Sequence, residues 1–430
     1  MNYKQMINLG LTASTESLDS MIPPLPVDGQ YTDAVLDDVT NVEGSMEDLS
    51  AGLHVLCGVA DKLVTIRNAM VSSGPLSSVS VEAYTTAIDN LLNPLGLKDL
   101  MISAEGFAHD PDASLKYSAE GIQQVLNTII ERLIELIQAA VEKGKEYITK
   151  LFGATEPLEK RLQTTLEKAD KLSLVSASKP TVEITASEAE WIVDGKGSMD
   201  ISMAVKAYDN MLGSATYGKP EDAARLIRSV VSIMKGWTTN IDAAFSEDAF
   251  KNVDRPPMST AYNPKTGIDE SFVYTPYALH ISADVLPTIE FVPREDREEP
   301  KGKVQIPVIQ TMAMVSFLTG LSRAVNTLKE QQQRYEEVQT AMAEYGQVVE
   351  SLKSIQFEDE EKGSRFRDVL MMVNASIRSY GDYPIRAAAK GIHGVSALES
   401  VMSKMLSQAY GKSETDAGAT GTGAATQEAS

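Results

Sequence analysis

The sequence predicts a mainly α-helical protein: a bundle of long helices and helical hairpins, with a small β or irregular insertion and a disordered C-terminal tail. Three observations carry this prediction. Apolar residues recur at spacings of three and four over long stretches, which is the period of an amphipathic helix. Aromatic residues make up only 6% of the chain, and its 18 Met residues suit helices better than a β-sandwich. Residues 254–306 contain seven prolines and have no helical period, so they form the insertion.

The first 120 residues form an acidic leader that resembles a propeptide. They hold 17 acidic against 5 basic side chains, a net charge of −12, whereas the remaining residues hold 43 against 34, a net charge of −9. Prolines at 23, 24 and 26 predict a loop, and the patterns of residues 46–71 and 81–92 predict two helices. Residues 105–114 are polar and rich in turn formers, so we expect the leader to end in a loop.

A helical region follows over residues 121–253. Nine apolar residues at helical spacing predict one long helix from Gly121 to about Gly153: Ile122, Val125, Leu126, Ile129, Ile130, Leu133, Ile134, Ile137 and Val141. Pro157 is expected to open a second helix, which ends near Leu174. A short strand is predicted at residues 181–184, and further helices at 198–211, with Ser198 as its cap, and at 220–245.

The Pro-rich insertion, residues 254–306, is predicted to contain a β-hairpin. Its two candidate strands, residues 271–282 and 285–292, are rich in Val, Ile, Tyr and Phe.

The last structured region is predicted over residues 307–410. A long helix to about Ile355 carries a heptad-like apolar seam over residues 318–352, with Gln332 as a polar break. Two uses of this seam are open: a packed helical hairpin within the chain, or self-association as a coiled coil. Helices at 365–380 and 384–409 follow, and residues 411–430 are Gly-, Ala-, Thr- and Ser-rich, which predicts a disordered tail.

Composition excludes several functional classes. Cys57 is the only cysteine, so neither an intramolecular disulfide nor a Cys-based zinc site can form, and a buried thiol is expected. No segment reaches the roughly 18 apolar residues of a membrane span. The net charge of −21 argues against specific nucleic-acid binding, which requires clustered Lys and Arg.

No catalytic, cofactor or metal motif is recognisable, so we expect a protein that is not an enzyme and that needs no cofactor. The four histidines, at 54, 109, 280 and 393, have no metal-ligand spacing. Residues 194–198, Asp-Gly-Lys-Gly-Ser, lack the first glycine of a phosphate-binding loop and are expected to form a turn before a helix.

One repeat is informative. Ser103-Ala104-Glu105-Gly106 recurs fifteen residues later as Ser118-Ala119-Glu120-Gly121, where the leader gives way to the first long helix. A small residue two positions before Glu is found for five of the six glutamates up to residue 120, but for only 5 of the 28 that follow. The other three in the leader are Glu16, Glu47 and Glu82. Ser118 could also serve simply as a helix cap.

The repeat and the layout of residues 1–152 resemble the internal head proteins of giant phiKZ-like tailed bacteriophages. In that family a prohead protease removes an N-terminal propeptide by cutting after Glu, with a small residue two positions earlier. The resemblance implies a cut after Glu105 or Glu120, with Ser103 or Ser118 as the small determinant and Gly106 or Gly121 as the new start. It implies secondary cuts at Glu16, Glu47 and Glu82. Glu142, Glu146 and Glu156 carry the same tripeptide, but we expect helical structure to protect them.

The resemblance also implies a location and partners. The chain would be made in the host bacterial cytoplasm and built into the capsid interior. Its partners would be other phage head proteins, the prohead protease as the processing enzyme, and another copy of itself through residues 318–352. Three alternatives stay open: an uncleaved cytosolic helical scaffold or adaptor, an enzyme without a recognisable motif, and a protein ejected with DNA that acts on membranes through residues 122–152.

Overall fold

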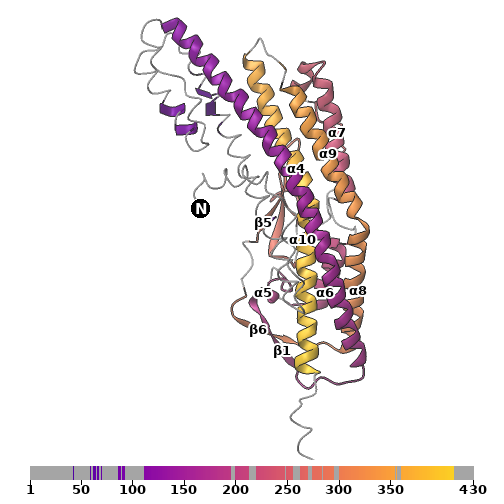
Figure 1. Cartoon of the computed structure of the whole chain (residues 1–430). Helices are drawn as coiled ribbons and strands as arrows, with labels where there is room; N and C mark the ends of the chain where they lie inside the picture. Colours follow the sequence, from indigo (N-terminus) through magenta and orange to yellow (C-terminus); the bar gives the residue numbers. More distant parts are fainter. Residues whose placement is uncertain are drawn as a thin grey trace, which may run out of the picture.

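A computed structural model gives the fold (Figure 1). The structure describes residues 111–410 apart from 195–198, 213–218, 247, 255–261, 270–273, 283, 295–299, 354 and 356–359. Before residue 111 it describes residues 42, 59, 62, 63, 65, 66, 69, 86–88 and 90–92, all of them helical. Within helix α4, side chains are described from Ile134 onward, together with those of Thr128 and Glu131. Cys57 and the tail, residues 411–430, lie outside the described residues.

The described chain is a bundle of long helices around α10, Glu360–Ala409, which confirms the predicted fold class. Helix α10 contacts α4, Pro111–Lys171, and also α6, Ile201–Leu212. It contacts α7, Pro220–Trp237, as well. Its apolar residues are buried along most of its length, from Phe366 to Ala409, which is why this helix forms the centre of the core.

Two of the predicted helix boundaries are wrong, because prolines lie inside single helices. Helix α4 runs through Pro157, and α10 runs through Pro384. A proline inside a helix removes one backbone hydrogen bond and costs about 3 kcal/mol. The residues around Pro157 explain why the helix continues: Ala154, Leu158 and Leu162 are 0–2% exposed. Their burial in the core offsets the loss, so tertiary packing overrides the local preference.

The start of α4 also differs from the prediction. The helix begins at Pro111, ten residues before the expected start at Gly121. Proline suits the first position of a helix, because its missing N–H would have no partner there and its φ is already helical. The acidic leader therefore gives way to regular helix before the second Ser-Ala-Glu-Gly repeat.

The long helix predicted after Pro307 is divided at Gln331 into α8, Thr311–Glu330, and α9, Gln332–Leu352. The two do not form a hairpin with each other. Lys329, near the end of α8, pairs with Glu159 of α4, and Lys353, just after α9, pairs with Glu131 of α4. Helices α8 and α9 therefore run one after the other, antiparallel to α4 (Figure 1).

Two small antiparallel sheets lie beside the helices. The predicted strand at residues 181–184 is confirmed as β1, Thr181–Thr185, which pairs with β6, Lys303–Pro307. The predicted hairpin is confirmed as β4, Tyr277–Ile281, paired with β5, Ile289–Pro293. The short strands β2, Tyr262–Asn263, and β3, Ile268–Asp269, complete a sheet in the order β2-β3-β4-β5.

The remaining helices follow the predictions with small corrections. Helix α6 begins at Ile201, and Asp200 caps it, because its Oδ1 accepts a hydrogen bond from Met203 N at 3.1 Å; Ser198, the predicted cap, lies outside the described residues. Val193 and Met199 form an antiparallel bridge on either side of residues 194–198. Helix α7 ends at Trp237, earlier than expected, and a 3₁₀ turn, Ile241–Phe245, follows it.

Candidate functional site

The candidate processing residues fall partly inside the described structure. Ser118, Glu120 and Gly121 lie within α4, in its third turn. The first copy of the repeat, at residues 103–106, and the secondary candidates Glu16, Glu47 and Glu82 lie outside the described residues. A protease binds its substrate as an extended strand, so cutting after Glu120 requires the first turns of α4 to unwind.

The later glutamates with the same tripeptide lie in helix, as expected. Glu142, Glu146 and Glu156 all belong to α4, and each pairs with a lysine three or four positions away. Burial acts to raise the pKa of Glu146, but Lys143 and Lys150 outweigh it and hold that pKa below its ordinary value. The hydrogen bond from Lys160 lowers the pKa of Glu156. This face of α4 therefore presents carboxylates and lysines that neutralise one another.

The apolar seam over residues 318–352 is buried within the chain. Its members are 0–5% exposed: Leu318, Leu321, Val325, Leu328, Tyr335, Val338, Met342, Tyr345, Val349 and Leu352. They pack in the core that α8 and α9 share with α4, α6 and α7. The folded chain therefore uses this seam internally. This burial favours packing within the chain, one of the two uses that the sequence left open, over a coiled coil between copies.

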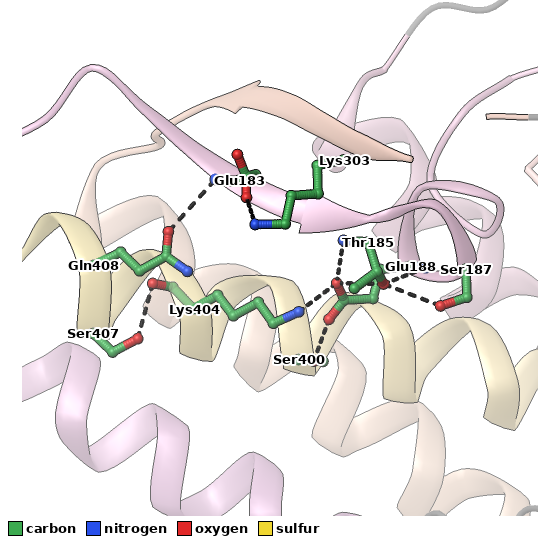
Figure 2. Close-up of polar contacts among 9 residues, drawn as sticks. All are labelled: Glu183, Thr185, Ser187, Glu188, Lys303, Ser400, Lys404, Ser407 and Gln408. Atoms are coloured by element: carbon green, nitrogen blue, oxygen red, sulfur yellow. Dashed lines mark hydrogen bonds and ion pairs between the residues drawn. The ribbon is translucent and has the colours of Figure 1, made fainter. Parts of the chain in front are cut away.

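A polar cluster joins the small β1–β6 sheet to the last turns of α10 (Figure 2). Its centre is Glu188 of α5, Ala186–Ala189, the short helix after β1. Ser400 donates to one carboxylate oxygen of Glu188 at 2.6 Å, and Lys404 donates to the other at 2.6 Å. The backbone N–H of Thr185 also donates to Glu188, at 2.8 Å, as part of a capping box.

The electrostatics of Glu188 favour its ionised form. Burial acts to raise the pKa of Glu188, but the hydrogen bonds from Lys404, Ser400 and Thr185 together hold it below the ordinary value of 4.5. Beside it, Lys303 of β6 pairs with Glu183 of β1, and the amide N–H of Glu183 donates to Gln408 Oε1 of α10 at 3.5 Å. The cluster therefore ties both strands to the bundle.

A buried carboxylate joins α10 to α4. Glu399 is 3% exposed and pairs with Arg161 of α4. Thr165, one turn further along α4, donates its hydroxyl to Glu399 at 2.7 Å. A buried carboxylate is costly unless it is paired and hydrogen-bonded, and both conditions are met here.

Closer to its N-terminus, α10 carries two more groups of buried charges: the pair Arg378 and Asp382, and Lys390. Arg378 and Asp382 pair at 3.5 Å, and burial raises the pKa of Asp382 despite that cation. Lys390, 3% exposed, has its ammonium 3.7 Å from the centre of the Tyr277 ring and 5.1 Å from that of Phe291. Both rings belong to the β4–β5 hairpin, so this cation–π contact holds the hairpin on α10.

Among the described residues, no three His, Cys, Asp or Glu side chains converge as they would at a metal site. His280 lies on β4 and His393 lies on α10, where its ring stacks on Trp191. His54 and His109 lie outside the described residues. In the part of the chain that the structure describes, no helix is long and apolar enough to cross a membrane.

Sequence reasoning missed the buried charges of α10. It included Glu188 and Glu399 only in the count of five later glutamates with a small residue two positions earlier. For Glu188 a signal was available. Thr185-x-x-Glu188 has the spacing of a capping box, in which the threonine and the glutamate each bond the other's backbone N–H. For Glu399 no local signal exists, because its partners lie 234 and 238 positions away.

Comparison with known proteins gives one match. The family model for phiKZ-like phage internal head proteins matches residues 30–390. No curated protein and no solved structure matches the chain. The match covers the leader's described residues, both small sheets and most of the bundle. It ends before Glu399, Ser400 and Lys404, so the polar contacts at the end of α10 lie beyond it.

Proposed function

The chain belongs to the family of phiKZ-like phage internal head proteins, and from that premise we propose that it is matured in the assembling head by cleavage after Glu105. As a member of the family it is a structural protein of the head interior, associated with other head components. The proposal adds the processing enzyme, a prohead protease, and the position of the cut.

The position of α4 supports Glu105 over Glu120. Both glutamates lie in the same tetrapeptide, so the local sequence does not distinguish them. Glu120 is helical, whereas Glu105 precedes Pro111, the first residue of α4. A cut after Glu105 leaves α4 whole, while a cut after Glu120 removes its first ten residues and requires them to unwind first. Where folding precedes processing, Glu105 is therefore the preferred site.

Removal of the leader also makes the net charge of the protein less negative. Residues 1–105 hold 14 acidic and 4 basic side chains, so their loss takes the net charge from −21 to −11. A less negative protein is repelled less by packaged DNA, which carries one negative charge per roughly 1.7 Å of duplex length. The mature chain stays acidic, so this change favours packing beside DNA over binding to it.

The test is N-terminal peptide mapping of the protein from purified phage particles. We expect a mature start at Gly106. Phage that encode Glu105→Gln should lose this start, whereas phage that encode Glu120→Gln should keep it. An intact Met1 in particles would overturn the processing proposal and favour an uncleaved scaffold. A start at Gly121 would mean that the protease acts before α4 has folded.

A further inference from the structure

Two connections of the chain meet at the end of the bundle that carries β1 and β6 (Figure 1). One leads from α4 to β1, and the other leads from β6 into the first turn of α8. The Thr311 hydroxyl donates to Ser173 O at 3.4 Å, and the Val308 N–H donates to Pro180 O at 2.9 Å. The two connections therefore lie side by side and share one surface.

Apolar side chains gather on this surface and form what is called here the apolar tip. Leu174 is 98% exposed, Met312 is 70% exposed and Val175 is 45% exposed. Three half-buried side chains lie beside them, so the apolar tip consists of Leu172, Leu174, Val175, Val308, Ile309 and Met312. Single exposed apolar residues are common on protein surfaces, but a contiguous group marks a contact with another molecule.

Lysines border the apolar tip. Lys168 and Lys171 lie in the last turn of α4, and Lys179 lies just before β1; all three are exposed. Among the described residues, none of these lysines has an ion-pair partner. The carboxylates in the same stretch are those of Glu167 and Asp170, also exposed. Three lysines against two carboxylates give this border a net charge of +1, on a chain whose net charge is −21.

The nearest parts of this chain do not supply a cover for the apolar tip. The tail begins beside it, because the Tyr410 hydroxyl donates to Ile309 O at 2.9 Å, but residues 411–430 contain no Leu, Ile, Val, Met or aromatic residue. The leader joins α4 at Pro111, and the 61 residues of that helix place this point about 90 Å from the tip. A second copy of the tip would set lysines against lysines, which is unfavourable.

We infer that the apolar tip is the surface through which this chain docks on another protein of the head interior, and that this partner presents an apolar pocket bordered by carboxylates. As a member of its family, the chain associates with other head components. Leu174 and Met312 project into solvent, so the complementary surface is concave and apolar. The bordering lysines align that surface by attracting carboxylates around the pocket.

This docking does not depend on the proposed cut after Glu105. The cut lies before Pro111, at the opposite end of α4, so it leaves the apolar tip unchanged. An intact Met1 in particles would overturn the processing proposal and leave the docking surface standing. Normal incorporation of tip variants would overturn the docking surface and leave the processing proposal standing.

The test measures how much of the protein enters phage particles. Phage encode the double variant Leu174→Asp, Met312→Asp, and quantitative mass spectrometry counts the copies per purified particle. We expect about tenfold fewer copies than for the parent, because an aspartate at each projecting position removes the apolar contact. Met203→Asp is the matched control: Met203 is 51% exposed but lies on α6, so its copy number should equal that of the parent. Equal thermal midpoints of the purified proteins show that each variant folds.

A charge variant keeps the test decisive if the aspartates impair folding. Lys171→Glu, Lys179→Glu reverses two charges of the border without touching an apolar side chain. We expect the copy number to fall by about threefold, as for the loss of two exposed ion pairs. Lys206→Glu, an exposed position of α6, should keep the parent copy number.

A photoreactive amino acid in place of Leu174 identifies the occupant inside intact particles. We expect cross-links to another head protein, in a peptide that holds Asp or Glu beside apolar residues. Parent copy numbers for Leu174→Asp, Met312→Asp would overturn the inference. Cross-links only to a second copy of this chain would overturn it too. The same holds if the parent binds vesicles of anionic phospholipid, the double variant does not, and no cross-link to a head protein forms, because a membrane would then be the occupant.

Discussion

Arg161 of α4 and Glu399 of α10 form an ion pair across the bundle, between residues 238 positions apart in the chain. The Glu399 carboxylate is almost fully buried, and the Thr165 hydroxyl satisfies its second oxygen. The pair thus fixes the position of α4 along α10 near the end where β1 and β6 are attached.

Glu399→Gln should destabilise the fold. The substitution keeps the shape of the side chain but leaves the Arg161 guanidinium without its anion, so we expect the free energy of unfolding to fall by roughly 1.5–3 kcal/mol. Urea unfolding followed by circular dichroism measures this change. Glu156→Gln is the control, because its ion pair with Lys160 lies on the exposed side of the same helix. Similar losses of unfolding free energy for both variants would show that burial of Glu399 does not strengthen its ion pair.

Gly394→Ala and Gly153→Ala should have opposite effects. A Cβ at Gly394 would lie 2.0 Å from Cζ of Tyr208, whereas a Cβ at Gly153 would meet nothing within 4 Å. Both glycines are helical, so each alanine gains up to about 1 kcal/mol of helix propensity. At Gly394, overpacking of about 1–3 kcal/mol outweighs that gain. Thermal unfolding should show a lower midpoint for Gly394→Ala and a higher one for Gly153→Ala; the same sign for both would refute the packing argument.

Glu188 should stabilise the fold above pH 4.5 and lose this effect in acid. Because its pKa is lower in the folded chain than its ordinary value of 4.5, the ionised form favours folding, and the contribution disappears as the pH falls through the folded pKa. The stability difference between the parent and Glu188→Gln should therefore shrink between neutral pH and about pH 3. Urea midpoints measured along this range provide the test.

Asp382 should show the opposite pH dependence of stability, so it serves as a contrast to Glu188. Burial raises its pKa above the ordinary value of 3.8, so the folded state favours the protonated carboxyl, and its contribution to stability is lost as the pH rises through the folded pKa. Asp382→Asn should gain stability relative to the parent as the pH rises from about 3 toward neutral. A parallel pH dependence for Asp382→Asn and Glu188→Gln would contradict both assignments.

Leu321→Ala should unfold the chain more easily without dissociating an oligomer. Leu321 is fully buried in the seam, so truncation should cost about 2–5 kcal/mol of unfolding free energy. Met312, 70% exposed on the same helix, is the control, and Met312→Ala should change stability by less than about 0.5 kcal/mol. Sedimentation velocity supplies the second measurement. Conversion of a dimer into a stable, folded monomer by Leu321→Ala would restore the coiled-coil interpretation.

Duplex DNA should bind weakly and without sequence preference, including after removal of the leader. On α4 the lysines at 143, 145, 150 and 160 pair with glutamates of the same helix, so they provide no free basic stripe. Fluorescence anisotropy with random-sequence duplex at low and physiological salt provides the measurement. Tight binding that survives physiological salt would show that cations from separate elements converge in the fold.

The sequence by itself determined the elements whose signal is local. Helical spacing of apolar residues identified the helices that became α6 and α7, and β-branched and aromatic residues around a turn identified the β4–β5 hairpin. These predictions succeed because an amphipathic pattern must place its apolar side against a core, wherever that core is. The absence of clustered motifs likewise pointed to a structural protein, in agreement with the family match.

Only the tertiary structure decided what depends on distant partners. Pro157 and Pro384 were each expected to open a new helix, yet both lie inside helices, because burial of the residues around them offsets the lost hydrogen bond. The seam at 318–352 had a clear period, but a period cannot show whether its partner is another copy or α4. Glu399 is the sharpest case. From the sequence alone, this glutamate is expected at the surface. In the fold, Arg161 and Thr165 lie beside it, and only these two partners offset the free-energy cost of burying its charge.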